Sequence, residues 1–217
     1  MSELWNLFQY LINPEWIFIH YGQTALFILL AIVFAETGLF IGFFLPGDSL
    51  LFAAGIFGDA LVKSIYDVPF VVIILLVALA AIFGNILGYW FGHKSGPLLF
   101  MRKDSLLFKR RHFIIAKAFY KRYKTIALIM SRFLPMLRTF APIVAGIVRI
   151  SFKQFMIYNI IGALAWAFSI MLAGHYLDKT FPTLKNHLEW IVLIIVLVTT
   201  VPVLLKIIIR KKKKIFT

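Results

Sequence analysis

Four charged side chains lie in stretches of this chain that are otherwise apolar enough for a membrane interior: Glu36, Asp48, Arg132 and Arg138. One ionised side chain at the centre of a bilayer costs ~2.5–3.5 kcal/mol on the lenient insertion scale. Arginine holds a phosphate through two parallel hydrogen bonds and keeps its charge, whereas a carboxylate can take up and release a proton. The sequence therefore predicts phosphate binding at Arg132 and Arg138 and proton coupling at Glu36 and Asp48.

The two acids are candidates for a proton-coupled switch. At membrane depth, loss of water disfavours their charged forms, while nearby arginines favour them. In one state the acids would pair with the arginines, and protonation would free the arginines for an anionic headgroup. A purely structural network of the same charges is the alternative interpretation, although buried ion pairs stabilise a protein less well than apolar residues do.

The composition places the chain in a membrane. Of its 217 residues, 62% are hydrophobic, which is more than the interior of a water-soluble protein of this size can bury. The absence of cysteine excludes disulfides and thiolate metal sites, and we expect no metal and no cofactor. The histidines stand at 20, 93, 112, 175 and 187, without the Ser-Gly-His or Arg-x-x-x-x-x-His pattern of a lipid phosphatase. An enzyme is therefore disfavoured.

Hydropathy divides the chain into three parts: an interfacial amphipathic helix at 1–21, a membrane domain at 22–205 and a basic tail at 206–217. A bilayer core of about 30 Å requires ~20 residues of helix. About four stretches meet that length, at 22–40, 69–93, 152–177 and 188–209. Two further apolar stretches, 41–58 and 126–148, are interrupted by proline and by charge.

The distribution of basic residues predicts how these stretches cross the membrane. Of the 23 Lys and Arg residues, ten lie between Lys94 and Lys124 and six between Lys206 and Lys214. The positive-inside rule places both blocks in the cytoplasm. This requires 126–148 to enter and return on the cytoplasmic side, so that 41–58 enters from the outer face and both termini are cytoplasmic.

The two interrupted stretches are therefore expected to form re-entrant hairpins. Their helix-breaking residues are Pro46 and Gly47 in the first, and Pro135 and Pro142 in the second. The two stretches also share a weak internal sequence similarity: FLPGDSLLFAAG at 44–55 and FLPMLRTFAPIVAG at 133–146. This similarity suggests an inverted repeat, which in transporters places the binding site near the bilayer midplane. Pro46-Gly47 taken alone would equally indicate a kink in a membrane helix.

Other polar and small residues are expected to shape the same interior. Gly84, Gly88 and Gly92 are spaced by four residues, which is typical of a close-packing face of a membrane helix rather than of a phosphate loop. Asn85, Asn159 and Trp166 are expected to line or brace the site.

These motifs together resemble those of the DedA family of bacterial inner-membrane proteins. They are Glu36-Thr-Gly with Phe44-Leu-Pro-Gly-Asp-Ser, Gly84-Asn-x-x-Gly-Tyr-x-x-Gly, Arg132-Phe-x-Pro-x-x-Arg-Thr-x-x-Pro-x-x-Ala-Gly, and Asn159-x-x-Gly-Ala-x-x-Trp. The resemblance covers about residues 20–178. It implies an all-α integral membrane protein with two oppositely oriented re-entrant hairpins in an inverted repeat. The family's functional acids and arginines map onto Glu36, Asp48, Arg132 and Arg138.

The resemblance also implies a function: transport between leaflets of a phosphate-bearing lipid, of the undecaprenyl phosphate or phosphatidylethanolamine type, in support of envelope integrity. The expected location is the bacterial inner membrane. The expected partners are membrane lipids, with anionic headgroups at the cytoplasmic face; a homo-oligomer is left open. The net charge of +14 is explained by topology rather than by nucleic-acid binding. A proton-coupled exporter or antiporter of small cations or drugs is the alternative function.

Overall fold

The regular elements of the structure are all helices in the part of the chain that it describes. This computed structural model describes residues 23–38, 47–101, 126–133 and 135–181. The helices are α3 (Gln23–Gly38), α4 (Gly47–Ile56), α5 (Gly58–Ser64), α6 (Phe70–Met101), α8 (Ile126–Ser131), α9 (Pro135–Ile147) and α10 (Phe152–Thr180). The predicted interfacial helix at 1–21, the span at 188–209, the tail at 206–217 and Pro46 lie outside the described residues.

Helices α6 and α10 are long enough to cross a membrane. Their apolar stretches, Phe70–Gly96 and Phe152–Thr180, contain 27 and 29 residues, which at 1.5 Å per residue exceed the ~30 Å of a bilayer core. They correspond to the spans predicted at 69–93 and 152–177. Of the span predicted at 22–40, the structure describes α3, which has 16 residues.

The stretch 126–148 is broken into two helices, as its proline and charge pattern predicts. Helix α8 ends at Ser131, a turn follows at Arg132 and Phe133, and α9 begins at Pro135. Proline is favoured at the first position of a helix, where its missing N–H leaves no bond unmade. In the stretch 41–58, helix α4 begins at Gly47.

Pro142 does not act as the helix breaker that its type predicts. It is buried inside α9, which continues to Ile147. Proline at this position removes one N–H···O=C bond of the helix, but α9 is supported along its length by α6. A β carbon built on Gly88 of α6 would lie in ordinary contact with Pro142, 3.4 Å from its Cβ. Packing between the two helices thus holds the proline within a continuous helix.

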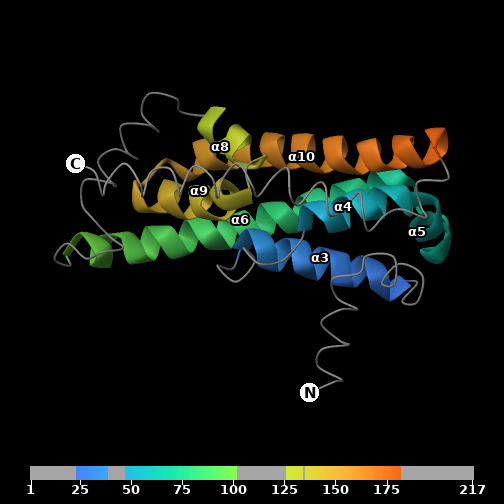
Figure 1. Cartoon of the computed structure of the whole chain (residues 1–217). Coiled ribbons are helices and arrows are strands. Elements are labelled where there is room, and N and C mark those ends of the chain that lie inside the picture. The colour runs from blue at the N-terminus through green and yellow to red at the C-terminus, as the bar shows by residue number, and fades with distance from the viewer. Residues whose placement is uncertain (1–22, 39–46, 102–125, 134, 182–217) are drawn as a thin grey trace, which may run out of the picture.

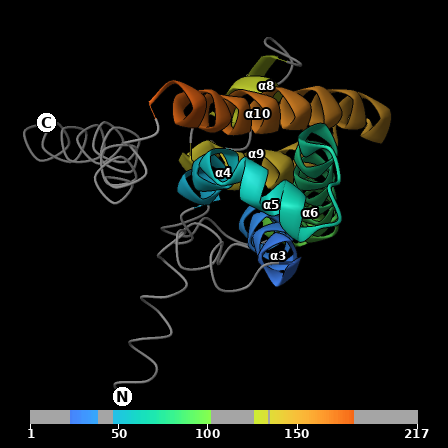
Figure 2. The ribbon, with the colours of Figure 1, turned by 90° about the vertical axis from the view of Figure 1, so that its right-hand side faces the viewer.

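The short helices α4 and α9 lie between the longer ones. In Figure 1, α10 runs along one side and α6 and α3 along the other, with α4 towards the end that carries α5 and α9 towards the opposite end. The view in Figure 2 also places α4 and α9 between α10 and α3. Helix α4 packs mainly on α10, whereas α9 packs mainly on α6. Helices α4 and α9 thus each pack on the long helix that belongs to the other half of the chain, whereas α8 packs on α10 of its own half.

Small residues bring these pairs of helices into close contact. A β carbon on Gly92 of α6 would overlap the carbonyl oxygen of Ile143 in α9. At the matching contact of α4 with α10, a β carbon on Gly55 would overlap the carbonyl oxygen of Met171. The predicted close-packing face of α6 is therefore present, and its glycines allow backbone to approach backbone.

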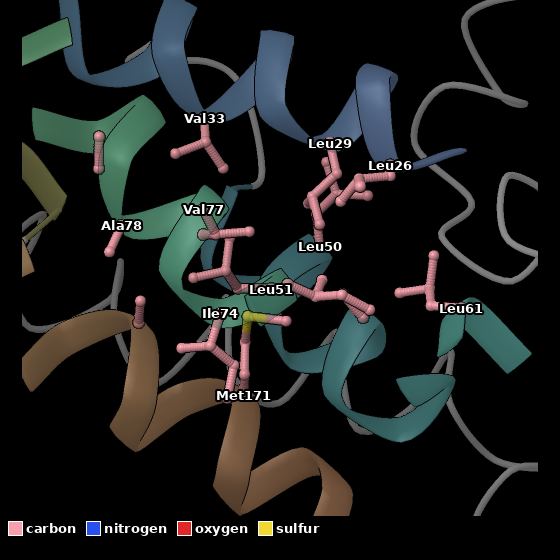
Figure 3. Packing of buried hydrophobic residues seen from close by; sticks show 14 of the residues in the cluster. Leu26, Leu29, Val33, Leu50, Leu51, Leu61, Ile74, Val77, Ala78 and Met171 are labelled. Atoms are coloured by element: carbon pink, nitrogen blue, oxygen red, sulfur yellow. The ribbon is translucent and has the colours of Figure 1, made fainter. Parts of the chain in front are cut away.

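A hydrophobic cluster joins α3, α4, α6 and α10. Leu29, Leu50, Ile74 and Met171 are almost completely buried in it, and Figure 3 shows these side chains meeting from the four helices. The outward faces of α6 and α10 also carry large exposed apolar side chains, among them Leu75, Leu79, Phe83, Leu87, Ile157, Ile161 and Leu172. Such an apolar exterior suits a lipid environment.

Candidate functional site

Arg138 of α9 joins the two predicted acids in the interior. Its Nη1 donates a hydrogen bond to Oδ1 of Asp48 in α4 at 2.5 Å, and its Nη2 forms an ion pair with Oε1 of Glu36 in α3. The side chains of Arg138 and Glu36 are 2% and 4% exposed. One guanidinium therefore bonds two carboxylates that the sequence separates from it by 90 and 102 positions.

Trp166 of α10 completes this group, which we call the Arg138 cluster: Glu36, Asp48, Arg138 and Trp166. The indole N–H donates to Oδ1 of Asp48 at 2.9 Å. The guanidinium carbon of Arg138 lies 4.9 Å from the centre of the indole ring, a distance at which a cation is attracted to an aromatic face. Four helices thus each contribute one side chain to the cluster.

Gly47 allows Glu36 to approach the start of α4. A β carbon at residue 47 would overlap the Glu36 carboxylate. This glycine was predicted as a helix breaker because of its place beside Pro46. The structure places it as the first residue of α4, where the absence of a side chain leaves room for the acid.

Arg132 lies apart from the acids. It is 2% exposed and forms no ion pair with a carboxylate among the described residues. Its Nη2 donates instead to the side-chain and backbone oxygens of Asn159 in α10. The two predicted phosphate-binding arginines therefore have different surroundings, because among the described side chains acids pair with Arg138 and an amide bonds Arg132.

The ends of two helices add partial positive charge near these residues. Asp48 is in the first turn of α4, and Arg138 is in the first turn of α9. Because the Arg138 side chain bonds Asp48, the first turns of α4 and α9 lie within reach of one arginine side chain. Helix N-termini carry partial positive charge and unbonded N–H groups, which favour anions.

A pocket of about 260 Å³ reaches the Arg138 cluster from one side. Asp48 and Trp166 form its polar part, and the other lining residues are mostly apolar: Phe52, Phe133, Ser169, Ile170 and Ala173. The Asp48 side chain is 23% exposed, against 4% for Glu36. Of the two acids, Asp48 is thus the more exposed, and it lines the pocket.

The structure therefore brings together Glu36, Asp48, Arg138 and Gly47, whereas Arg132 is bonded to Asn159 outside this group. Pro135 and Pro142 lie on α9 and shape that helix. Three further residues are expected from the sequence only to line or brace the apolar interior. In the structure Trp166 bonds Asp48 and Asn159 bonds Arg132. Asn85 bonds Asn159 and so contacts the charged group indirectly. Within the described ranges no group of three His, Cys, Asp or Glu side chains could hold a metal ion.

Comparison with known proteins identifies the family to which this chain belongs. The VTT domain family matches residues 45–176, a range that includes Asp48, Arg132, Arg138 and Trp166. The chain is 37% identical to Protein DedA of Escherichia coli over 192 residues, which cover 88% of this chain and 86% of that protein. The chain belongs to the DedA family of VTT-domain proteins.

Other DedA-family relatives are named as membrane proteins. An uncharacterized membrane protein of Mycobacterium tuberculosis is 36% identical over 187 residues, covering 85% of this chain and 79% of that protein. Inner membrane protein YqjA of Escherichia coli is 29% identical over 188 residues, covering 85% and 80%. No solved structure matches the chain significantly. Together with the apolar faces of α6 and α10, these relationships establish a DedA-family membrane protein.

Proposed function

We propose that this DedA-family protein moves a phosphate-bearing lipid, of the undecaprenyl phosphate or phosphatidylethanolamine type, between the leaflets of the bacterial inner membrane. The observation that carries the proposal is the unequal surroundings of the two arginines. Arg138 is bonded to two carboxylates, whereas Arg132 is buried with no carboxylate partner in the part of the chain that the structure describes. A buried guanidinium without an acid is costly unless an anion binds it.

In this proposal Arg132 is the permanent contact for the phosphate and Arg138 is the conditional one. A proton that reaches Asp48 through the pocket neutralises its carboxylate and weakens its bond to Arg138. The Nη1 edge of Arg138 is then available for a second phosphate oxygen, while Nη2 stays with Glu36. Release of the phosphate and of the proton restores the pair between Arg138 and Asp48.

The arrangement of the helices supports a site that both leaflets can reach. We propose that α4 and α9 are the inner arms of two oppositely oriented re-entrant hairpins, and that both termini are cytoplasmic as the basic residues indicate. The N-termini of α4 and α9 meet at the Arg138 cluster, which is how interrupted helices in transporters present partial positive charge to an anionic group.

The test is lipid translocation by the purified full-length protein in liposomes, with and without a pH gradient. The substrates are fluorescent phosphatidylethanolamine, a polyprenyl phosphate and, as the control, a diglucosyl diacylglycerol, whose polar headgroup lacks phosphate and does not cross a bilayer readily by itself. We expect translocation of at least one phosphate lipid above the rate in protein-free liposomes, no acceleration of the glycolipid, and a loss of at least tenfold in Arg132→Gln. Equal acceleration of the glycolipid, or wild-type rates in Arg132→Gln, would contradict a phosphate site at Arg132.

Proton coupling is tested with Asp48→Asn in the same liposomes. The amide mimics the protonated acid, so exchange of lipid down its gradient should continue while accumulation driven by a pH gradient is lost. Thermal stability in detergent is measured beside transport, because a merely structural acid would show its loss there. Unchanged gradient-driven accumulation in Asp48→Asn at wild-type stability would show that Asp48 does not carry the coupled proton, whereas a lack of accumulation by the wild-type protein would indicate a passive scramblase.

One observation favours a second candidate, a proton-coupled exporter of small cations or drugs. The pocket places the Asp48 carboxylate beside Trp166 within mostly apolar walls, a combination that suits an organic cation. The same liposomes, loaded with a fluorescent organic cation in place of labelled lipid, test this candidate. Dye movement that depends on Asp48, without any lipid movement, would make it the better function.

A further inference from the structure

We propose that Asn159 of α10 and Asn85 of α6 are positioning residues, which hold one edge of the Arg132 guanidinium and leave the other edge for a phosphate group. The inference rests on the function proposed above and extends it to residues that do not themselves contact the charged acids. The anion site is then assembled where the two long helices meet.

The hydrogen bonds around Asn159 define the orientation of its amide. Its Nδ2 donates to the carbonyl oxygen of Ile82 in α6 at 3.2 Å. Its Oδ1 therefore points to the opposite side, where it accepts hydrogen bonds from Nη2 of Arg132 and, at 2.9 Å, from Nδ2 of Asn85. The backbone carbonyl of Asn159 accepts from the same Nη2 at 3.2 Å. The Asn159 amide thus bonds α6 through its nitrogen, and its oxygen bonds both Arg132 and Asn85 of α6.

The stem of Arg132 is held by the next turn of α10. A β carbon at Gly162 would lie 2.9 Å from Cδ and 3.1 Å from Nε of Arg132. The arginine side chain therefore lies directly against the backbone of α10, which only glycine allows without displacement. Contacts at Gly162 and at Asn159 together restrict both the position and the rotation of the guanidinium.

The other edge of the guanidinium is the candidate anion contact. Nη1 of Arg132 is buried and has no hydrogen-bond partner among the described residues. A buried charged donor without an acceptor is unfavourable, and a phosphate oxygen would supply that acceptor. The side chain that holds Arg132 is a neutral amide rather than a carboxylate. An amide orients the guanidinium without neutralising it, so the full positive charge is kept for the ligand.

The experiment measures the dissociation constant of a short-chain phosphate lipid, dioctanoyl phosphatidic acid, with the purified full-length protein in detergent. Inorganic phosphate and dioctanoylglycerol are titrated separately, which distinguishes a lipid headgroup from free phosphate and from the lipid chains. The variants are Arg132→Gln as the reference for a lost cation, Asn159→Asp, and Asn85→Leu. Thr37→Val is the matched control, because Thr37 is a buried polar residue whose side-chain hydrogen bonds within the described ranges go to the backbone of its own helix α3.

We expect Arg132→Gln to raise the dissociation constant at least tenfold. Asn159→Asp should approach the same loss, because its carboxylate would neutralise Arg132. Asn85→Leu should raise the constant about threefold or more, because Asn159 loses one of the two side-chain donors that fix its oxygen. Thr37→Val should leave it unchanged. Phosphatidic acid should bind more tightly than inorganic phosphate, and dioctanoylglycerol should not bind at the site.

A structural role for the two asparagines gives a different result. Partial misfolding lowers the number of binding sites per molecule and the melting temperature, but leaves the dissociation constant of the remaining sites unchanged. That outcome in Asn159→Asp and Asn85→Leu would overturn the positioning role while Arg132→Gln could still support the phosphate site. If Asn159→Asp does not fold, the dissociation constant of Asn85→Leu is compared with that of Thr37→Val, and this comparison tests the positioning role. A wild-type constant in Arg132→Gln would overturn both this inference and the role of Arg132 in the proposed function.

Discussion

At the scale of single residues, the contact between Gly47 and Glu36 requires a residue without a side chain at position 47. Gly47 is the first residue of α4, and a β carbon at this position would overlap the Glu36 carboxylate. We therefore expect Gly47→Ala to lower the melting temperature and to reduce lipid translocation at least tenfold. Glu36→Asp in the Gly47→Ala background shortens the acid by one methylene group and should recover part of the stability. Wild-type stability and rate in Gly47→Ala alone would contradict the contact.

Arg138 and Asp48 should behave as one unit in mutant combinations. Lysine at 138 keeps the positive charge but cannot present two parallel donors to two carboxylates or stack on Trp166 as a guanidinium does. We expect Arg138→Lys to reduce gradient-driven translocation at least tenfold. Because Asp48→Asn removes part of the same interaction, the double variant should lose less stability than the sum of the two single losses in free energy of unfolding. Strict additivity of these losses, measured by the unfolding of the four proteins in detergent, would show that the two residues act independently.

At the scale of helices, the contact between α6 and α9 provides two glycines one turn apart with different surroundings. A β carbon on Gly88 would lie 3.4 Å from Pro142 and 3.5 Å from Ile143, at ordinary contact distances. A β carbon on Gly92 would overlap the Ile143 carbonyl oxygen. We expect Gly92→Ala to push α9 away from α6 and lower the melting temperature by several degrees, whereas Gly88→Ala should change it little. Equal effects of the two substitutions would contradict the close approach at Gly92.

The crossed packing of α4 on α10 and α9 on α6 has a consequence at the same scale. Each short helix carries one part of the ion pair between Asp48 and Arg138, and each rests on a different long helix. A change in this pair therefore acts on the contact between the two halves of the chain rather than within one half.

At the scale of the whole molecule, the orientation in the membrane is testable because the chain has no cysteine. Single cysteines at Asp59, which is exposed in α5, and at Lys109 provide one probe on each predicted side. We expect the cysteine at 59 to react with an impermeant thiol reagent in intact cells, and the cysteine at 109 to react only after lysis. Labelling at 109 alone in intact cells would invert the predicted topology.

The sequence by itself determined the properties that depend on local composition. An excess of apolar residues requires a membrane, and Glu36, Asp48, Arg132 and Arg138 are visible as charges within apolar stretches without knowledge of their neighbours. The interruption of 126–148 also follows from local signals, because proline at the start of α9 favours a new helix there. Pro142 shows the limit of such signals, since its effect on the helix depends on the support that α9 receives from α6.

Only the tertiary structure decided which charges meet and which do not. Four charges within one bilayer allow several pairings, and no spacing rule distinguishes them because the partners come from different helices. Packing of α3, α4, α9 and α10 around one point bonds Arg138 to both acids and places its guanidinium over the Trp166 ring. Arg132 receives a neutral amide, Asn159, in place of a carboxylate. The difference between the two arginines thus arises from the directions in which folded helices present their side chains, which local sequence does not encode.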